Sequence, residues 1–76
     1  MRELVEVIAK SLVDYPDQVE VSERKAGKTT IVELKVASSD MGKVIGKQGK
    51  IAKAIRSLVK AAATRENIRV VVDIVE

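Results

Sequence analysis

The feature that most constrains the fold is a glycine-bearing interruption in an otherwise helical pattern. The stretch Gly42–Lys50 reads GKVIGKQGK and holds three of the four glycines in the 76-residue chain. Apolar residues recur at helical spacing after it, and a shorter helical segment precedes it. The pattern therefore predicts two consecutive helices, over residues 41–45 and 50–67, that meet at the turn Gly46–Gly49.

The other segments are predicted from periodicity and turn residues. A helix is expected over residues 2–14, because Pro16 forces Tyr15 out of the helical region. Strands are expected over residues 17–25, 29–37 and 68–74, the first two joined by the turn 26–28. Helix-capping side chains are expected at Ser38, Ser39 and Asp40. The predicted inward stripes are Leu4, Val5, Ile8, Leu12 and Val13 in the first helix, and Ile51, Ala54, Ile55, Leu58, Val59 and Ala62 in the long helix.

This order predicts an α+β fold, α-β-β-α-α-β, with a three-stranded sheet and helices packed on one face. The last strand follows a helical crossover, which allows it to run parallel to a neighbour. The chain is short enough that residues 1–76 are expected to form a single domain.

The composition narrows the function. The chain has no cysteine and no histidine, so it lacks thiolate metal ligands and the usual general base near neutral pH. We therefore expect no enzyme activity, no metal and no cofactor. No apolar run is long enough to cross a membrane, and acids interrupt the N-terminal segment where a signal peptide needs an apolar core, so a cytoplasmic protein is expected.

Charge is distributed unevenly along the chain. Residues 41–65 carry seven basic residues and no acid, whereas the rest carries the other seven basic residues and all eleven acidic ones, a net charge of −4. Such a separation favours a polyanionic partner.

The turn Gly46–Gly49 has the properties of a phosphate-backbone clamp. Two interpretations of Gly46 stay open. It is either a helix-terminating residue in the left-handed conformation or a point where the absence of a Cβ lets another backbone come close. Gly49 lies where Ser or Asp would cap the next helix better, so close approach explains it better. The first N–H groups of that helix, at Lys50 and Ile51, favour an anion. Lys43, Lys47 and Lys50 add positive charge.

Two other phosphate-binding motifs do not fit. A P-loop needs four residues between its glycines, but three separate Gly42 from Gly46, and Gln48 stands where Ser or Thr is required. A dinucleotide fingerprint needs G-x-G-x-x-G after a strand, and only G-x-x-G is present, after a helix.

Residues Val44–Ile51 read VIGKQGKI, and Ile55 follows four positions later; this extended match resembles the signature of the KH domain. In KH domains a G-x-x-G loop between two helices clamps about four nucleotides of backbone. The whole chain resembles the small stand-alone bacterial KH proteins of the KhpA type, with the type II element order.

The resemblance implies a cytoplasmic protein that binds single-stranded RNA in an aliphatic groove, as an RNA chaperone or post-transcriptional regulator. It also implies a homodimer, or a heterodimer with a larger KH-containing protein. The implied RNA-binding residues are Lys43, Ile45, Gly46, Lys47, Gln48, Gly49, Lys50 and Ile51. Arg65, Asn67 and Arg69 lie near a loop that, in the family, borders the groove opposite the glycines.

Several alternatives stay open at this stage. Ile45 and Ile51 could be core residues or the groove floor, and Lys53, Arg56 and Lys60 are interpreted as a solvated outer face. One rival function is a protein-interaction or dimerisation module with incidental nucleic-acid binding. Another is single-stranded DNA binding, because the clamp contacts the sugar-phosphate backbone, where only the 2′-OH distinguishes RNA from DNA.

Overall fold

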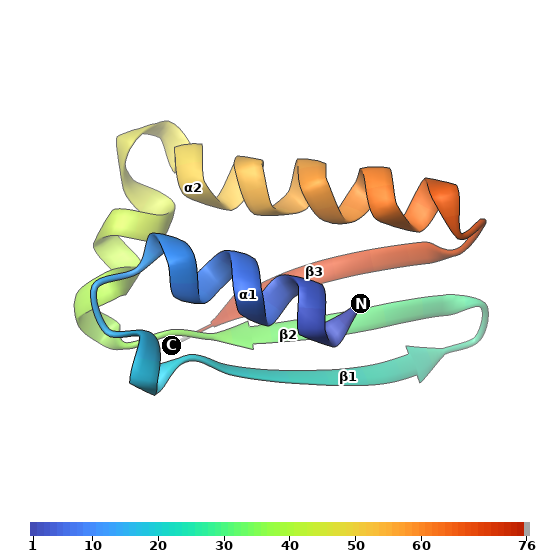
Figure 1. Cartoon of the computed structure of the whole chain (residues 1–76), viewed down its shortest axis with the longest axis horizontal. Helices are drawn as coiled ribbons and strands as arrows, with labels where there is room; N and C mark the ends of the chain where they lie inside the picture. Colours follow the sequence, from blue (N-terminus) through green and yellow to red (C-terminus); the bar gives the residue numbers. More distant parts are fainter. Residues whose placement is uncertain (76) are drawn as a thin grey trace.

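The computed structural model describes residues 1–75, apart from the side chain of Lys47, and arranges them as a sheet covered by helices (Figure 1). In chain order the elements are α1 (Arg2–Leu12), the short 3-10 helix η1 (Pro16–Gln18), β1 (Glu20–Ala26), β2 (Thr29–Lys35), α2 (Ser38–Arg65) and β3 (Arg69–Val75). The predicted α+β class is confirmed.

The sheet has β2 at its centre and is mixed. β1 and β2 pair antiparallel up to Ala26 and Thr29, and the turn between them has Gly27 at φ 65°, as a two-residue hairpin turn requires. β2 and β3 run parallel, with Val32 opposite Val72, so the chain must cross back over the sheet between them. α2 makes this crossover, and the last strand runs parallel to β2, as the sequence pattern allowed.

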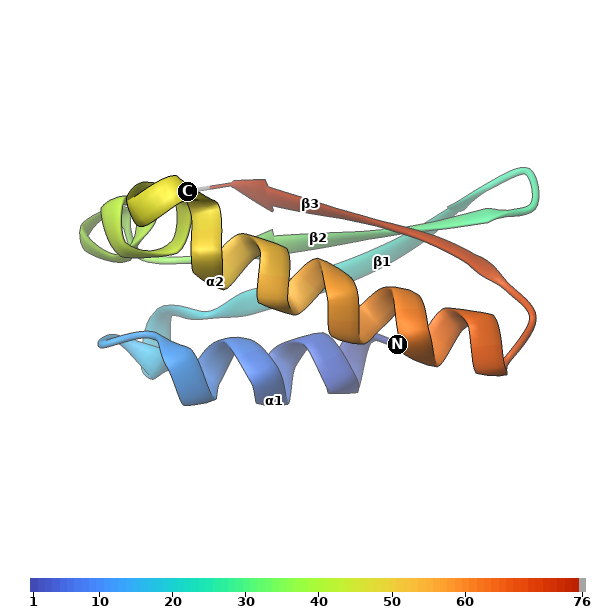
Figure 2. The ribbon, with the colours of Figure 1, turned by 90° about the horizontal axis from the view of Figure 1, so that it is seen from above.

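Both α1 and α2 cover the same face of the sheet (Figure 2). The core lies between the layers, and Leu34 and Ile55 are fully buried there. Burial of a side chain of this size contributes about 2–3 kcal/mol. The opposite sheet face is exposed at Glu33 and Lys35. The buried cluster comprises Val5, Ala9, Val19, Val32, Leu34, Val36, Val44, Ala52, Ile55, Val59 and Val72.

The inward faces of the helices differ from the predicted stripes. In α1, Val5 and Ala9 are fully buried, whereas Leu4 and Leu12 are each 36% exposed. In α2, Ile55 and Val59 are buried, but Leu58 is 53% exposed, so the predicted position of Leu58 in the core is wrong. The reason is the same in both helices. Small alanines at the interface, Ala9 in α1 and Ala52 and Ala63 in α2, let the helices approach the sheet and rotate the contact line away from the larger leucines.

The connection before β1 also differs from the prediction. Residues 16–18 form η1 rather than strand, with the Gln18 and Val19 N–H groups donating to the carbonyls of Tyr15 and Pro16 at 3.0 and 3.2 Å. Pro16 fixes its own φ at a value that suits such a turn, so extended structure begins only at Glu20.

The start of α2 likewise lies earlier than expected. The helix begins at Ser38, its N-cap is Ala37, and no side chain caps it, so the predicted caps are wrong. Asp40 is instead fully buried, and its carboxylate accepts hydrogen bonds from the backbone N–H groups of Asp14 (3.0 Å) and Tyr15 (3.1 Å). These bonds fasten the segment after α1 to the beginning of α2.

α2 is helical over its whole length except at one point, where Gln48 and Gly49 have φ values of 65° and 67°. A right-handed helix cannot continue through left-handed residues, and the ribbon changes direction sharply there (Figure 1). α2 therefore consists of two helical segments, as predicted. It ends where Asn67 takes φ 57° and the Asn67 and Ile68 N–H groups donate to the carbonyls of Thr64 and Ala63, the Schellman arrangement.

Candidate nucleic-acid interface

The predicted clamp lies at the break in α2, at the end of the molecule opposite the β1–β2 turn (Figure 1). The side chains of Gln48 and Lys50 are exposed on this turn. The side chain of Lys47, predicted to supply charge, lies outside the described part of the structure. The turn thus presents polar side chains to solvent around a backbone that carries two glycines.

The two glycines of the turn are there for different physical reasons. Gly49 has φ 67°, a conformation that strains any residue with a Cβ. Gly46 has no positive φ, so its predicted left-handed conformation is wrong. A Cβ built on Gly46 would meet no atom within 4 Å. Neither backbone conformation nor packing inside the chain requires glycine at position 46, and the space above it is open.

The isoleucines around the turn separate into surface and core. Ile45 is 47% exposed, whereas Ile51 is half-buried and packs against the core cluster. Val44 and Ile55 are fully buried, which confirms the predicted inward position of Ile55 and adds Val44 to the core. Ile45 therefore offers an apolar surface next to Gly46, and Ile51 offers only an edge.

Lys43 is engaged within the chain. Its Nζ atom lies 2.9 Å from Oδ1 of Asp14, the residue whose N–H donates to Asp40. Both side chains are largely exposed, and a surface ion pair of this kind contributes at most about 1 kcal/mol. A phosphate near Lys43 would therefore compete with Asp14 for the ammonium group.

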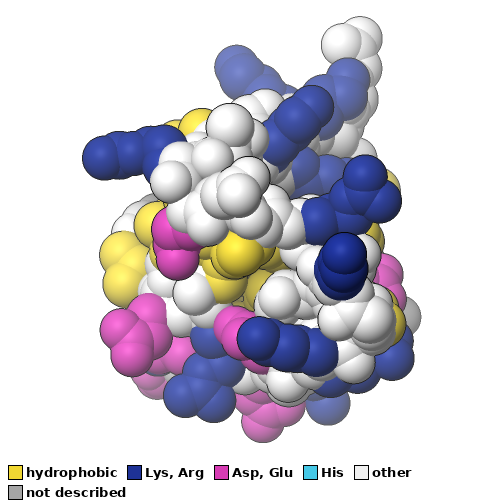
Figure 3. Space-filling view, turned by 90° about the vertical axis from the view of Figure 1, so that its right-hand side faces the viewer, with side chains coloured by type: hydrophobic (Ala, Val, Ile, Leu, Met, Phe, Trp, Pro, Cys, Tyr) yellow, Lys and Arg dark blue, Asp and Glu magenta, His cyan; other side chains and the backbone are white. Residues whose placement is uncertain are grey.

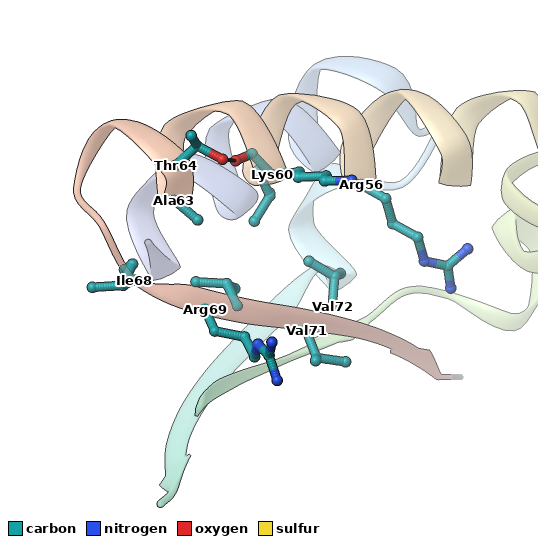
Figure 4. A pocket seen from close by; sticks show the side chains of 10 residues that line it. Arg56, Lys60, Ala63, Thr64, Ile68, Arg69, Val71 and Val72 are labelled. Atoms are coloured by element: carbon teal, nitrogen blue, oxygen red, sulfur yellow. Dashed lines mark hydrogen bonds between the residues drawn. The ribbon is translucent and has the colours of Figure 1, made fainter. Parts of the chain in front are cut away.

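A cleft of about 420 Å³ lies between the second segment of α2 and β3 (Figure 4). This volume is within the range of small-molecule pockets, about 300–1,000 Å³. Its lining is aliphatic toward the sheet and polar toward solvent, and comprises Arg56, Val59, Lys60, Ala63, Thr64, Ile68, Arg69, Val70, Val71 and Val72. The structure thus contains an aliphatic groove, but between α2 and β3 rather than at Ile45 and Ile51 alone.

Arg56 and Lys60 are exposed, as their interpretation as solvated residues predicts, but they line the cleft toward β3. With the predicted stripe centred on Leu58, both fell on the outer face of the helix. The true inward direction runs between Ile55 and Val59, which moves Arg56 and Lys60 onto the flank of α2 that faces β3. In Figure 4 both side chains extend from α2 over the cleft. The predicted stripe included Ala54 and Ala62, whereas the buried alanines of α2 are Ala52 and Ala63.

The cleft is basic and has no acidic residue in its lining. Among the described side chains, Arg56, Lys60 and Arg69 make no ion pair; the pairs that form are Lys10–Glu6, Lys35–Glu20 and Lys43–Asp14. Figure 3, which looks at the end of the molecule near the β1–β2 turn, shows Lys and Arg side chains mainly over its upper and right parts and acidic ones mainly at the lower left. The groove is suited to a negatively charged, partly apolar ligand.

Other kinds of site find no support in the described residues. No group of three acidic, histidine or cysteine side chains within residues 1–75 is placed to hold a metal ion. None of the helices in this part of the chain is long and apolar enough to cross a membrane.

The comparison with known families gives a match over nearly the whole chain. The model of the KhpA/KhpB KH-domain family matches residues 2–74. The chain belongs to this family. RNA-binding protein KhpA of Clostridium acetobutylicum is 65% identical over 75 residues, which cover 99% of this chain and all of that protein.

Further relatives carry the same name. RNA-binding protein KhpA of Clostridium perfringens is 64% identical over 99% of this chain and all of its own length. That of Halalkalibacterium halodurans is 57% identical over the full length of both chains. These relatives are named as RNA-binding proteins and not as enzymes. No solved structure gave a significant match.

Proposed function

We propose that this KhpA/KhpB-family protein binds single-stranded RNA, with the phosphate backbone against Gly46–Gly49 and the bases in the cleft between α2 and β3. The observation that carries the proposal is Gly46, where glycine is needed neither for its φ nor for packing. A missing side chain at that point leaves room for a strand from outside. The names of the relatives support RNA as the strand.

The chemistry divides between backbone and bases. The N–H groups of Lys50 and Ile51 open the second segment of α2, where free amide donors and the helix dipole favour a phosphate. Lys47 and Lys50 supply charge at the clamp. Bases would lie on Ile45 and on the aliphatic floor at Val59 and Val72, because the one aromatic residue, Tyr15, is outside the cleft.

The proposed binding is weak for one copy of the domain. Two or three phosphate contacts on a single strand give a slope of log affinity against log salt of about −1.4 to −2.1. Affinity in the micromolar range follows as an order of magnitude. We propose that pairing with a second KH module, in a homodimer or with a larger KH-containing partner, raises the effective affinity.

The remaining assignments rest on this proposal. Residues 1–76 act as one KH domain, in the cytoplasm, without catalysis and without a bound cofactor. The role in the cell is that of an RNA chaperone or post-transcriptional regulator, since a weak backbone-reading module can bind many RNAs and release them.

The test is the double variant Lys47→Asp/Gln48→Asp, which reverses charge at the clamp without touching the core. RNA affinity measured by fluorescence anisotropy should fall at least about tenfold, since charge-assisted phosphate contacts are lost. Circular dichroism must show an unchanged fold, and Lys10→Asp/Ser11→Asp on α1 is the matched control. Unchanged affinity in the folded double variant would refute the clamp. Competition by a DNA oligomer of the same sequence decides between RNA and single-stranded DNA.

A second function is favoured by the exposed leucine of α2. Leu58 lies about 60° from Ile55 on the side away from Arg56, and α1 and β3 lie on opposite sides of α2 (Figure 2). The flank toward α1 therefore carries Leu58 with the exposed alanines Ala54 and Ala61, and Leu4 of α1 is also partly exposed. We propose this strip as the surface for a second KH module. Size-exclusion chromatography with and without RNA separates this role from RNA-dependent association.

A further inference from the structure

A second hollow lies at the end of the molecule remote from the clamp. It is bounded by the β1–β2 turn on one side and the α2–β3 connection on the other, and its lining residues are Lys28, Thr29, Thr64, Asn67, Ile68 and Arg69. Five of these six side chains carry N–H or O–H donors, of which the Thr64 hydroxyl already donates to the carbonyl of Lys60 at 2.9 Å, and none is acidic. Both Lys28 and Arg69 are exposed and make no ion pair among the described side chains.

This hollow continues the cleft between α2 and β3. The two share Thr64, Ile68 and Arg69, which Figure 4 places together at one end of the cleft. From the clamp at Gly49 to Thr64, α2 rises about 1.5 Å per residue, which places the hollow about 22 Å along the helix from the clamp. Arg56 and Lys60 lie between them, so positive side chains follow the whole path.

Local structure fixes the donors of the hollow in place. Asn67 takes the left-handed conformation that ends α2, which holds it at the rim. Gly27, also left-handed, makes the tight turn that presents Lys28 at its tip. Arg69 is the first residue of β3 and pairs in register with Thr29 of β2. Two separate chain segments, residues 28–29 and 64–69, therefore converge on one basic depression.

We propose that this depression is a second binding site for RNA phosphates, so that the bound strand extends beyond the clamped nucleotides to the β1–β2 turn. Charge complementarity selects the occupant, because an unpaired lysine and arginine with hydroxyl and amide donors suit a phosphodiester chain. The clamp and groove of a KH domain hold about four nucleotides. A strand that reaches Lys28 must be longer, and the inference rests on the RNA-binding function proposed above.

The test compares two fluorescein-labelled RNA pools of random sequence, one of about five nucleotides and one of about twelve. Lys28→Glu should weaken binding of the longer pool about threefold to fivefold and lower its salt slope by about 0.7, because one phosphate contact is lost. Binding of the shorter pool should not change. Lys10→Glu, the same charge reversal on α1, is the control and should affect neither pool.

Each other result has a definite meaning. If Lys28→Glu and Lys10→Glu have the same affinity for the longer pool, the second site is refuted. The clamp is still supported in that case if Lys47→Asp/Gln48→Asp loses RNA binding. Equal weakening of both pools by Lys28→Glu also overturns the second site, because the hollow would then belong to the clamped segment. If Lys28→Glu disturbs the hairpin by circular dichroism, Lys28→Gln repeats the comparison and should also lower the salt slope of the longer pool by about 0.7, because the same phosphate contact is lost.

Discussion

On the flank toward β3, α2 holds Arg56 and Lys60 above an aliphatic cleft; on the flank toward α1, it exposes Leu58 beside alanines. Both flanks belong to the same helix and share the buried line through Ile55 and Val59. The proposed RNA site and the proposed protein-binding surface therefore lie on different flanks of one helix. One helix divides them, so a change on one flank should leave the other flank intact.

The largest effect is expected from Arg56→Glu/Lys60→Glu. Reversing both charges at the cleft should cost about 2 kcal/mol of RNA binding, or about thirtyfold in affinity by anisotropy. Self-association, measured by sedimentation, should not change. Lys10→Glu/Arg24→Glu, on α1 and on the open sheet face, carries the same total charge change as the control. Equal loss in both variants would mean that net charge, and not the cleft, governs binding.

Leu58→Glu tests the opposite flank. The side chain is half exposed, so the free energy of unfolding should change by about 0.5 kcal/mol or less. Self-association should weaken about tenfold, or about 1.4 kcal/mol, because a charge replaces an apolar contact. Affinity for a five-nucleotide RNA pool should stay the same. If self-association in the variant equals that of the original protein, the Leu58 strip is not the protein-binding surface.

Gly46→Ala separates stability from binding. Gly46 is helical without positive φ, so alanine should raise the free energy of unfolding by about 1 kcal/mol in thermal or urea denaturation. RNA affinity should fall about fivefold, since the new methyl group stands where the backbone would approach. Gly42→Ala, also helical with open space around its Cβ position, should bring the same stability gain without the loss of affinity. Equal RNA affinity of Gly46→Ala and Gly42→Ala would show that the RNA backbone does not approach Gly46.

The smallest effect is expected at the ion pair beside the clamp. Asp14→Asn releases Lys43, which lies 2.9 Å from the Asp14 carboxylate, and should strengthen RNA binding about twofold, or about 0.5 kcal/mol. The effect should disappear in high salt, where exposed charges are screened. Asp17→Asn removes the same charge from η1 nearby. An equal gain in RNA affinity in Asp17→Asn would mean that the effect comes from the overall electrostatic field of the protein and not from the release of Lys43.

The sequence predicts the element order well because each element has a clear period or breaker. The two-helix break at Gln48 and Gly49 and the hairpin at Gly27 were foreseen, and a parallel last strand was allowed. The inward faces of both helices were less well predicted. Ala9, Ala52 and Ala63 decide the helix rotation through close packing, and packing between layers depends on shape that a one-dimensional pattern does not carry.

The candidate site shows the same division between local and distant information. The turn Gly46–Gly49 is local in sequence, so its position between two helical segments was predictable. The cleft joins Arg56 and Lys60 of α2 with residues 68–72 of β3, and it exists only once the crossover has folded. Asp40 is a similar case, because nothing near it in sequence indicates that its carboxylate binds the backbone of Asp14 and Tyr15.

The parallel pairing of β2 with β3 has a consequence for folding kinetics. Thr29 and Arg69, which are partners in the sheet, are 40 residues apart, and the intervening chain contains the glycine turn of the clamp. Contacts between residues distant in sequence slow folding, because the chain loses loop-closure entropy before these contacts contribute any favourable free energy. The two glycines of the turn add to that barrier, because glycine loses more conformational freedom on folding than any other residue. The residues that leave room for an RNA backbone are therefore also expected to delay completion of the sheet.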